Sequence, residues 1–249
     1  MEKQIIKDFE NTYKNSLLND EVKLKKEFLN KFIQKGFPSK KNESWKFSDL
    51  NQIINNNIEN LTFYNDIKKS NKIDESLYIK NLEHNKMVFI NGKLEEINLE
   101  YEDGNRFKIL KETKVENVNF HDNALINLNN AFTINNYRIY IDKNYNVKKP
   151  LVVYHTTNTE INSTNINIQL NYSLGENSSL KIIDIFNDAS EKNFINIYYN
   201  FDLKKDAVLK NFKIDNVNNN NIKYSFNNIN QDTNSVSETF ILSNGSKFI

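Results

Sequence analysis

The 249-residue chain contains no cysteine, five glycines and two prolines, and these shortages limit its chemistry. Without cysteine it forms no disulfide, binds no metal through a thiolate and has no cysteine nucleophile. A chain with so few glycines also lacks a glycine-rich phosphate loop, so any ATP is expected to bind to a partner. Sulfur ligands for a metal would likewise have to come from another protein.

Neither sign of charge is in excess, because 33 basic residues face 32 acidic ones. The chain therefore lacks the positive surplus that drives binding to phosphate backbones, and nucleic acid is not an expected partner. No apolar run approaches the ~20 residues that cross a bilayer. The N-terminus, with Glu2, Lys3, Asp8 and Glu10, lacks the apolar core of a signal peptide. These absences predict a soluble, cytoplasmic protein without a membrane partner.

Aromatic and aliphatic residues are plentiful enough for a folded core. The 17 Phe and 12 Tyr, with many Ile and Leu, keep the composition well away from that of disordered chains. Asparagine occurs 48 times, whereas Arg106 and Arg138 are the only arginines. Because asparagine tolerates left-handed turns and caps helices, we interpret most of this excess as filler in loops.

The N-terminal part predicts two amphipathic helices up to Lys35. Apolar residues recur there at helical intervals. One stripe is Ile5, Ile6, Phe9, Tyr13 and Leu17, and most of the other is Val22, Phe28, Leu29, Phe32 and Ile33. Asn19 or Asp20 is expected to cap the second helix, and Gly36 is expected to end it.

A short third helix and a hairpin are expected next. Ser48 or Asp49 is placed to start the helix, which would run through Ile58. From Leu77 the pattern changes, and the apolar run 87–90 ends at the turn pair 91–92 before residues 94–99. An Asn-Gly pair between two such runs predicts a β-hairpin.

Regularly spaced strands beyond residue 136 are the most informative feature. Their candidate centres, at intervals of 12 to 15 residues, are Tyr140, Tyr154, Ile168, Ile183, Tyr198, Lys210, Tyr224 and Thr239. Several strands alternate apolar and polar residues, which is the period of a sheet with one buried face. Constant spacing favours a parallel β-helix with two strands per coil, in which strands stack on their predecessors. An antiparallel sandwich or jelly roll fits the periodicity about equally well.

The stretch from Gly36 to Leu50 reads GFPSKKNESWKFSDL. It resembles the N-terminal signature of the SufB and SufD family, scaffold proteins of iron–sulfur cluster assembly: a Gly-Leu/Phe-Pro step, basic residues, then Glu-x-Trp-Lys/Arg-Tyr-Thr-Asp-Leu. Phe47 replaces the usual Tyr and Ser48 the usual Thr. Residues 88–94 resemble the family's hydrophobic-Asn-Gly hairpin, and residues 128–132 resemble its Leu-Asn-x-Ala-Phe segment. The matching positions, interpreted as structural, are Gly36, Pro38, Glu43, Trp45, Lys46, Asp49, Leu50, Asn91, Gly92, Asn129 and Ala131.

This resemblance favours the solenoid over the sandwich. It implies a mainly β fold, with a helical region over residues 1–75, a linking α/β segment with a hairpin over 76–125, and a right-handed parallel β-helix over 126–249. The SufD type is preferred to the SufB type because the signature begins close to Met1 and cysteine is absent. The chain ends after a strand, so we expect an uncapped last coil with an unpaired edge that is prone to association.

The resemblance also implies a function. A SufD-like chain is a non-enzymatic scaffold that pairs with a SufB-like subunit through its β-helix and docks a SufC-like ATPase. The docking region and the family's cluster-linked histidine are expected beyond residue 249. No catalytic or metal-ligating residue and no cofactor are expected on this chain, and a transient iron–sulfur cluster belongs to the complex.

Two other classes of function remain open. A polysaccharide-active β-helix enzyme needs clustered Asp, Lys or Arg on successive coils, but no Arg follows Arg138 and no Asp ladder is apparent between Asp184 and Asp232. A structural or adhesive solenoid without chemistry would need no such cluster.

Several single residues have both a functional and a structural interpretation. Trp45 suits an interface contact, but a buried anchor is favoured because tryptophan buries a large area wherever it lies. His84, His121 and His155 lack metal-ligand spacing, and His155 is expected to be a hydrogen-bonded strand residue. The acidic residues Glu95, Glu96, Glu100, Glu102 and Asp103 are interpreted as a solvated face rather than an acid–base pair.

Overall fold

The computed structural model describes residues 2–14, 19–63, 78–112, 122–134, 136–158, 161–188, 190–217 and 220–245. The helices are α1 (Glu2–Tyr13), α2 (Asp20–Lys35), the 3-10 turn η1 (Glu43–Trp45), α3 (Leu50–Asn57) and α4 (Ala124–Phe132). The strands are β1 (Asn85–Ile90), β2 (Lys93–Asn98), β3 (Phe107–Glu112), β4 (Asn136–Ile141), β5 (Leu151–Thr157), β6 (Asn165–Leu174), β7 (Ser179–Asp188), β8 (Phe194–Leu203), β9 (Val208–Val217), β10 (Ile222–Gln231) and β11 (Val236–Gly245). In the described part of the chain, no helix is long and apolar enough to cross a membrane.

The helices begin and end where local chemistry predicts. Asn19 caps α2 by accepting a hydrogen bond from the backbone N–H of Glu21 at 2.9 Å, and Gly36 ends it with a φ of +66°. Asp49 caps α3 through the backbone N–H of Gln52 at 2.9 Å. These side chains satisfy donors that the first turn of a helix leaves unpaired, so the predicted starts of α2 and α3 and the predicted end of α2 are confirmed. Leu17, which was predicted to belong to the first helix, lies outside the described residues.

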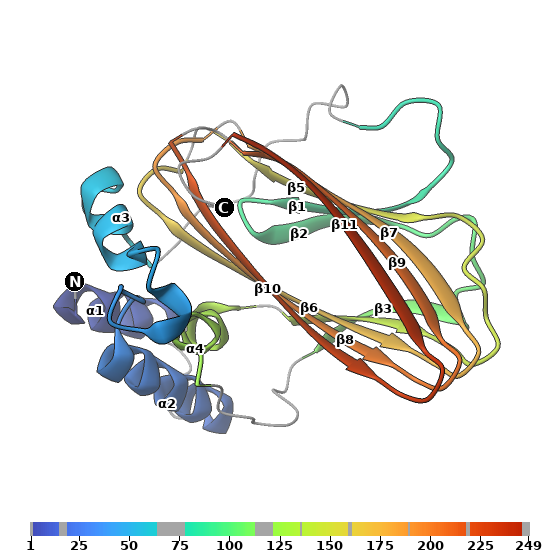
Figure 1. The fold of residues 1–249 in the computed structure, drawn as a ribbon, viewed down its shortest axis with the longest axis horizontal. Coiled ribbons are helices and arrows are strands. Elements are labelled where there is room, and N and C mark those ends of the chain that lie inside the picture. Colours follow the sequence, from blue (N-terminus) through green and yellow to red (C-terminus); the bar gives the residue numbers. More distant parts are fainter. Residues whose placement is uncertain are drawn as a thin grey trace.

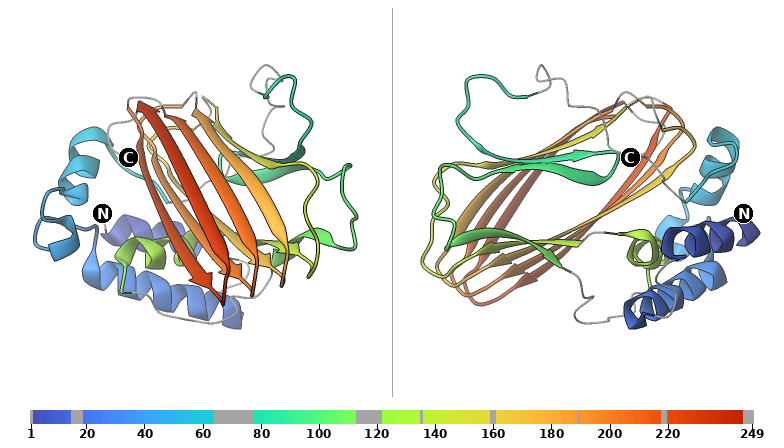
Figure 2. Two further views of the ribbon diagram at one scale, coloured as in Figure 1. Left: turned by 45° about the vertical axis from the view of Figure 1, so that its right-hand side comes forward. Right: turned by 180° about the vertical axis from the view of Figure 1, so that it is seen from behind.

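The strands form two sheets that the chain visits alternately. One sheet has the order β11-β9-β7-β5-β1-β2 and the other β10-β8-β6-β4-β3. From β6 onward, each strand lies parallel to the strand two positions earlier in the chain. The result is a β-solenoid of about four turns with two strands per coil. Figures 1 and 2 show the helices gathered at one side of this two-sheet body. The parallel β-helix prediction is therefore confirmed, and the antiparallel sandwich is wrong.

Strands from the segment before residue 126 complete both sheets. β1 lies parallel to β5 and forms the predicted hairpin with β2. β3 pairs antiparallel with β4. The solenoid thus begins within the segment 76–125, and α4, at the start of the range 126–249, packs with the helices instead.

Asparagine has a more specific role than filler. The side chain of Asn193 accepts from the backbone N–H of Thr164, and Asn221 accepts from that of Asn193 one coil later, at 3.0 and 2.7 Å. At the other corner, left-handed residues stack on successive coils: Asn144, Asn177, Asp206 and Asn234, with φ between +54° and +58°. Asparagine reaches this conformation at lower cost than most residues, so part of the excess builds the corners of the solenoid.

The turn of the β1–β2 hairpin gives a first prediction. A Cβ added at Gly92 would lie 2.6 Å from Cγ2 of Ile166, and its φ is +79°. Gly92→Ala is therefore expected to lower the free energy of unfolding by about 2 kcal/mol, through overpacking and backbone strain. Gly104→Ala is the matched control, because no atom lies within 4 Å of the added Cβ. Equal urea midpoints for the two variants would contradict the close approach.

Candidate functional site

The signature segment 36–50 joins the helices to the second sheet. Phe37 packs edge-to-face on Phe194 of β8, with ring centroids 5.6 Å apart. The half-buried Trp45 lies against Tyr224 of β10, with centroids 5.9 Å apart. Leu50 is fully buried among the helices. Trp45 is thus an anchor between the helical region and the solenoid, as its size favours.

The other signature residues of this segment shape its backbone or lie in solvent. The carbonyl of Pro38 accepts from the backbone N–H of Asn51 at 3.1 Å. Glu43 and Lys46 are exposed and pair with each other at 3.2 Å. Phe47, in the place of the family's Tyr, is 88% exposed. The segment therefore joins the helical region to the solenoid.

Asn129 of α4 connects the helical region with two strands at once. Its Nδ2 donates to the carbonyl oxygens of Ile168 in β6 and Asn196 in β8, at 3.0 and 2.8 Å. Asn196 returns a hydrogen bond to the carbonyl of Leu125 at 2.8 Å. All nine residues of α4 are buried, so these polar contacts lie away from water. Because these hydrogen bonds of the Asn129 and Asn196 side chains are buried, they fix the position of α4 on the sheet.

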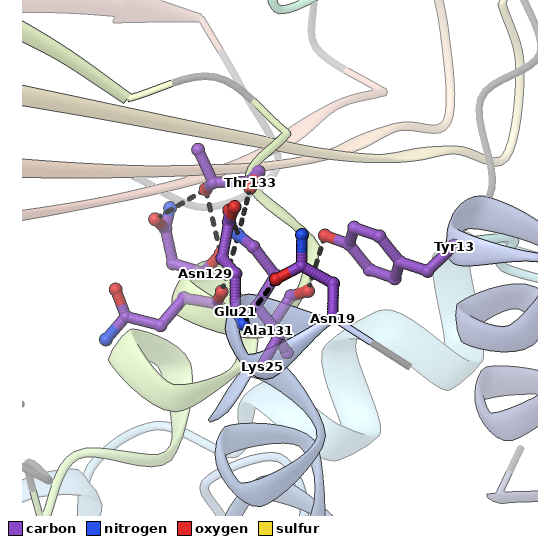
Figure 3. A network of polar contacts seen from close by, with 8 residues as sticks. Tyr13, Asn19, Glu21, Lys25, Asn129, Ala131 and Thr133 are labelled. Carbon is purple, nitrogen blue, oxygen red and sulfur yellow. Dashed lines mark hydrogen bonds and ion pairs between the residues drawn. The ribbon is translucent and has the colours of Figure 1, made fainter. Parts of the chain in front are cut away.

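A buried lysine attaches α4 to α2, and Figure 3 shows this network. Lys25 is 2% exposed, and its Nζ donates to the carbonyls of Thr133 and Asn130 at 2.6 and 3.5 Å. The hydroxyl of Tyr13 donates to the carbonyl of Ala131 at 2.9 Å. These groups satisfy carbonyls at the C-terminal end of α4. Burial lowers the pKa of Lys25 to about 8, although Glu21 opposes the shift.

The Asn91-Gly92 turn meets the same junction from the solenoid side. The side chain of Asn91 exchanges two hydrogen bonds with Asn158, one through its Nδ2 at 2.8 Å and one through its Oδ1 at 3.0 Å. Together with Phe63, Phe132 and Ile166, the turn lines a small pocket between the helices and β6. All three signature segments therefore converge where the helical region packs on the solenoid.

Five ionisable residues form a second candidate site inside the solenoid: His155, Asp184, Lys213, Asp215 and Lys223, called here the interior cluster. All are at most 5% exposed. His155 Nε2 lies 3.3 Å from Asp184 Oδ1, and the ring lies between Phe89 and Phe186 in a nearly parallel stack. Lys223 and Asp215 form an ion pair.

Lys213 is the unusual member of the interior cluster. Its Nζ lies 3.3 Å from the ring centroid of Tyr199 and donates to Asn227 Oδ1 at 2.8 Å. Among the described residues it forms no ion pair with a carboxylate. Burial lowers its pKa to about 8. For Asp184, burial acts to raise the pKa of the carboxyl group. The nearby His155, Lys213 and Lys223 outweigh this effect and lower the pKa to about 2.

The interior cluster does not match a metal centre. Across the described ranges, no group of three or more His, Asp or Glu side chains could hold a metal ion. His84 contacts the Leu82 carbonyl and the Tyr154 hydroxyl, and His121 lies outside the described residues. His155 is a residue of strand β5, as expected, but among the described residues neither of its ring nitrogens forms a hydrogen bond, and its Nε2 only contacts Asp184 Oδ1 at 3.3 Å.

Glu102 departs from the solvated face expected of the acidic residues. Its carboxylate accepts from Asn85 Nδ2, the Tyr145 hydroxyl and the backbone N–H groups of residues 148 and 149, at 2.7 to 3.2 Å. Burial opposes its ionisation, but these hydrogen bonds lower its pKa overall. Glu102 therefore fastens the start of β1 to the loop before β5.

The sequence pattern concealed the interior cluster. In β9, Val208, Phe212 and Ile214 alternate with the face that carries Asn211, Lys213 and Asp215, and the apolar face points outward. The pairing register with β7 reveals which face is internal.

No family model matches the chain, and the comparison with curated proteins finds no match.

Proposed function

We propose that this chain is a SufD-like, non-catalytic scaffold subunit of a cytoplasmic system that assembles iron–sulfur clusters. One observation carries the proposal: three segments resembling the SufB and SufD signature occur in the family's order, on a chain that folds as a helical region followed by a two-strand parallel solenoid. Their convergence on one junction explains why the resemblance is found there, since these residues join the two parts of the fold.

The proposed partner is a SufB-like subunit that pairs with the side of the solenoid formed by β10 and β11. Each of these ten-residue strands lies at the edge of its sheet within the described residues. β11 also exposes Phe240, Ile241 and Leu242, which are 58%, 54% and 55% exposed. An edge that is unpaired within the described residues and that exposes apolar side chains supports pairing with another strand, because main-chain hydrogen bonds and apolar burial act together.

The proposed division of labour is implied by the resemblance and agrees with the composition. A chain without cysteine supplies no thiolate for a cluster, and it has no glycine-rich loop for ATP. In the proposal the SufB-like subunit provides sulfur ligands, the SufC-like ATPase provides nucleotide hydrolysis, and this chain holds their geometry. The cluster is then transient cargo of the complex rather than a cofactor of this chain.

Co-purification tests the scaffold role. The tagged chain is co-expressed with a SufB-like and a SufC-like protein, and capture of the SufB-like subunit is measured. We expect Phe240→Lys to reduce that capture at least about tenfold, because it places a charge in an apolar contact. Phe47→Lys, at an exposed Phe of the helical region, is the matched control. Failure of the unmodified chain to associate would contradict the proposal and favour a structural solenoid.

A further inference from the structure

The contents of the solenoid interior change from coil to coil. Along one interior column the register places Met87, Val153, Asp184 and Lys213 in succession. A second column runs Phe89, His155, Phe186 and Asp215. On the opposite sheet, Ile166 and Ile195 are followed by Lys223. Along these columns, apolar side chains of the early coils are thus followed by charged side chains in the later ones.

The coil formed by β10 and β11 contributes nothing to the apolar core of the solenoid. β8 and β9 supply that core with Ile195, Ile197, Tyr199, Phe201, Leu203 and Leu209. No described residue of β10 or β11 belongs to it. Ile222 of β10 packs instead with the helices, while Ile229 and Ile241 are 37% and 54% exposed.

Polar contacts take the place of apolar packing beneath this coil. Lys223 of β10 forms its ion pair with Asp215 of β9, and Asn227 of β10 accepts from Lys213. Ser243 of β11 donates to the other oxygen of Asp215 at 3.5 Å. Apart from the sheet hydrogen bonds, the interior side of the coil is therefore attached through three charged side chains.

Such an attachment differs energetically from the other coils. Apolar side chains lose their favourable burial when a coil opens, whereas buried ions regain their hydration. Opening β10 and β11 would return Lys213, Asp215 and Lys223 to water, which offsets part of the lost contacts. Coils that release buried charge should open at lower free energy than coils that expose an apolar core.

We propose that the β10–β11 coil is an ionic lid: Lys213, Asp215 and Lys223 hold its interior side on the solenoid, Ile222 and Tyr224 hold β10 on the helical region, and the coil opens locally to expose the Lys213 amine while the earlier coils stay folded. The inference concerns contacts within one chain and its tests need no partner, although the proposed SufB-like subunit would pair with this same coil.

Amine labelling of the unmodified 249-residue chain tests the lid directly. Lys25 is the comparison for Lys213, because both side chains are 2% exposed and burial lowers the pKa of each to about 8. Lys25 lies in the helical region, away from the lid. With an amine-reactive ester and mass spectrometry, we expect Lys213 to react at least about tenfold faster than Lys25. Equal rates would overturn the lid.

Hydrogen exchange of charge variants tests whether the lid is ionic. Lys223→Met leaves Asp215 buried without its cation, and we expect residues 222–245 to exchange at least about tenfold faster while β6 to β8 stay unchanged. Lys210→Met is the matched control, because Lys210 forms an exposed ion pair with Glu238 between the same coils. The double variant Lys223→Met with Asp215→Leu should restore slow exchange. A Lys223→Met effect no larger than that of the control, or no recovery in the double variant, would overturn the proposal.

Discussion

Asn129→Asp is expected to lower the free energy of unfolding by about 4 kcal/mol, the largest effect of any single substitution considered for this chain. The change keeps the size of the side chain but replaces the donating Nδ2 with a carboxyl oxygen. That oxygen would face the carbonyls of Ile168 and Asn196, which now accept at 3.0 and 2.8 Å. Since Asn129 is fully buried, water cannot relieve the contact. Urea unfolding followed by circular dichroism measures the loss.

Asn55→Asp provides the control for this substitution. Asn55 lies on the exposed side of α3, and its one recorded side-chain hydrogen bond reaches Asn51 at 3.4 Å. Its effect should stay within about 0.5 kcal/mol, as for most surface changes. If both variants unfold at the same urea concentration, the two bonds from Asn129 do not hold α4 on the solenoid. A loss confined to the Asn129 variant assigns that signature residue to the junction between the two parts of the fold.

Local patterns in the sequence predicted much of the fold. Asn19, Gly36 and Asp49 marked helix ends because capping depends on neighbouring backbone groups and little else. Each predicted strand centre from Tyr140 to Thr239 lies inside an observed strand. The spacing was readable because each coil of a solenoid uses a similar length of chain. Periodicity alone left the choice between a solenoid and a sandwich open, because it does not contain the pairing partners; the resemblance favoured the solenoid, and the observed strand pairing confirms it.

Features that depend on contacts between distant residues escaped sequence reasoning. In β9 the outward face carries Phe212 and Ile214, whereas the inward face carries Lys213 and Asp215, so alternation of apolar and polar residues does not identify the buried side. The register of β9 on β7 places Lys213 next to Asp184, and only that register shows a charged interior. The role of Asn193 was hidden for the same reason, because its partner Thr164 lies one coil earlier. The sequence around an asparagine does not show whether its side chain bonds to a neighbouring coil or lies in an ordinary loop.

Raising the pH from 7.5 to 9.5 is expected to stabilise the chain, and Lys25→Met is expected to remove part of that gain. Burial lowers the pKa of Lys25 to about 8 in the folded state, against about 10.4 when unfolded. Below pH 8 both states hold the proton and stability does not depend on pH. Between the folded and unfolded pKa values of Lys25, only the unfolded state keeps the proton on this lysine. The free energy of unfolding therefore rises by about 1.4 kcal/mol per pH unit in this range. At pH 9.5, Lys25 then accounts for about 2 kcal/mol of the rise in the free energy of unfolding.

Other buried titratable groups also affect the stability between pH 7.5 and 9.5, so the contribution of Lys25 has to be separated from theirs. Burial raises the pKa of Tyr172 and Tyr199 well above 10, so these groups reduce stability only where unfolded tyrosine ionises, above the window. Lys213, whose pKa burial also lowers to about 8, adds a rise of the same sign. Urea titrations at several pH values should therefore show a smaller slope in Lys25→Met and an unchanged slope in Lys26→Met, a neighbouring exposed position. An unchanged slope in Lys25→Met would mean that Lys25 is hydrated in the folded chain, and that α4 is attached to α2 without a buried charge.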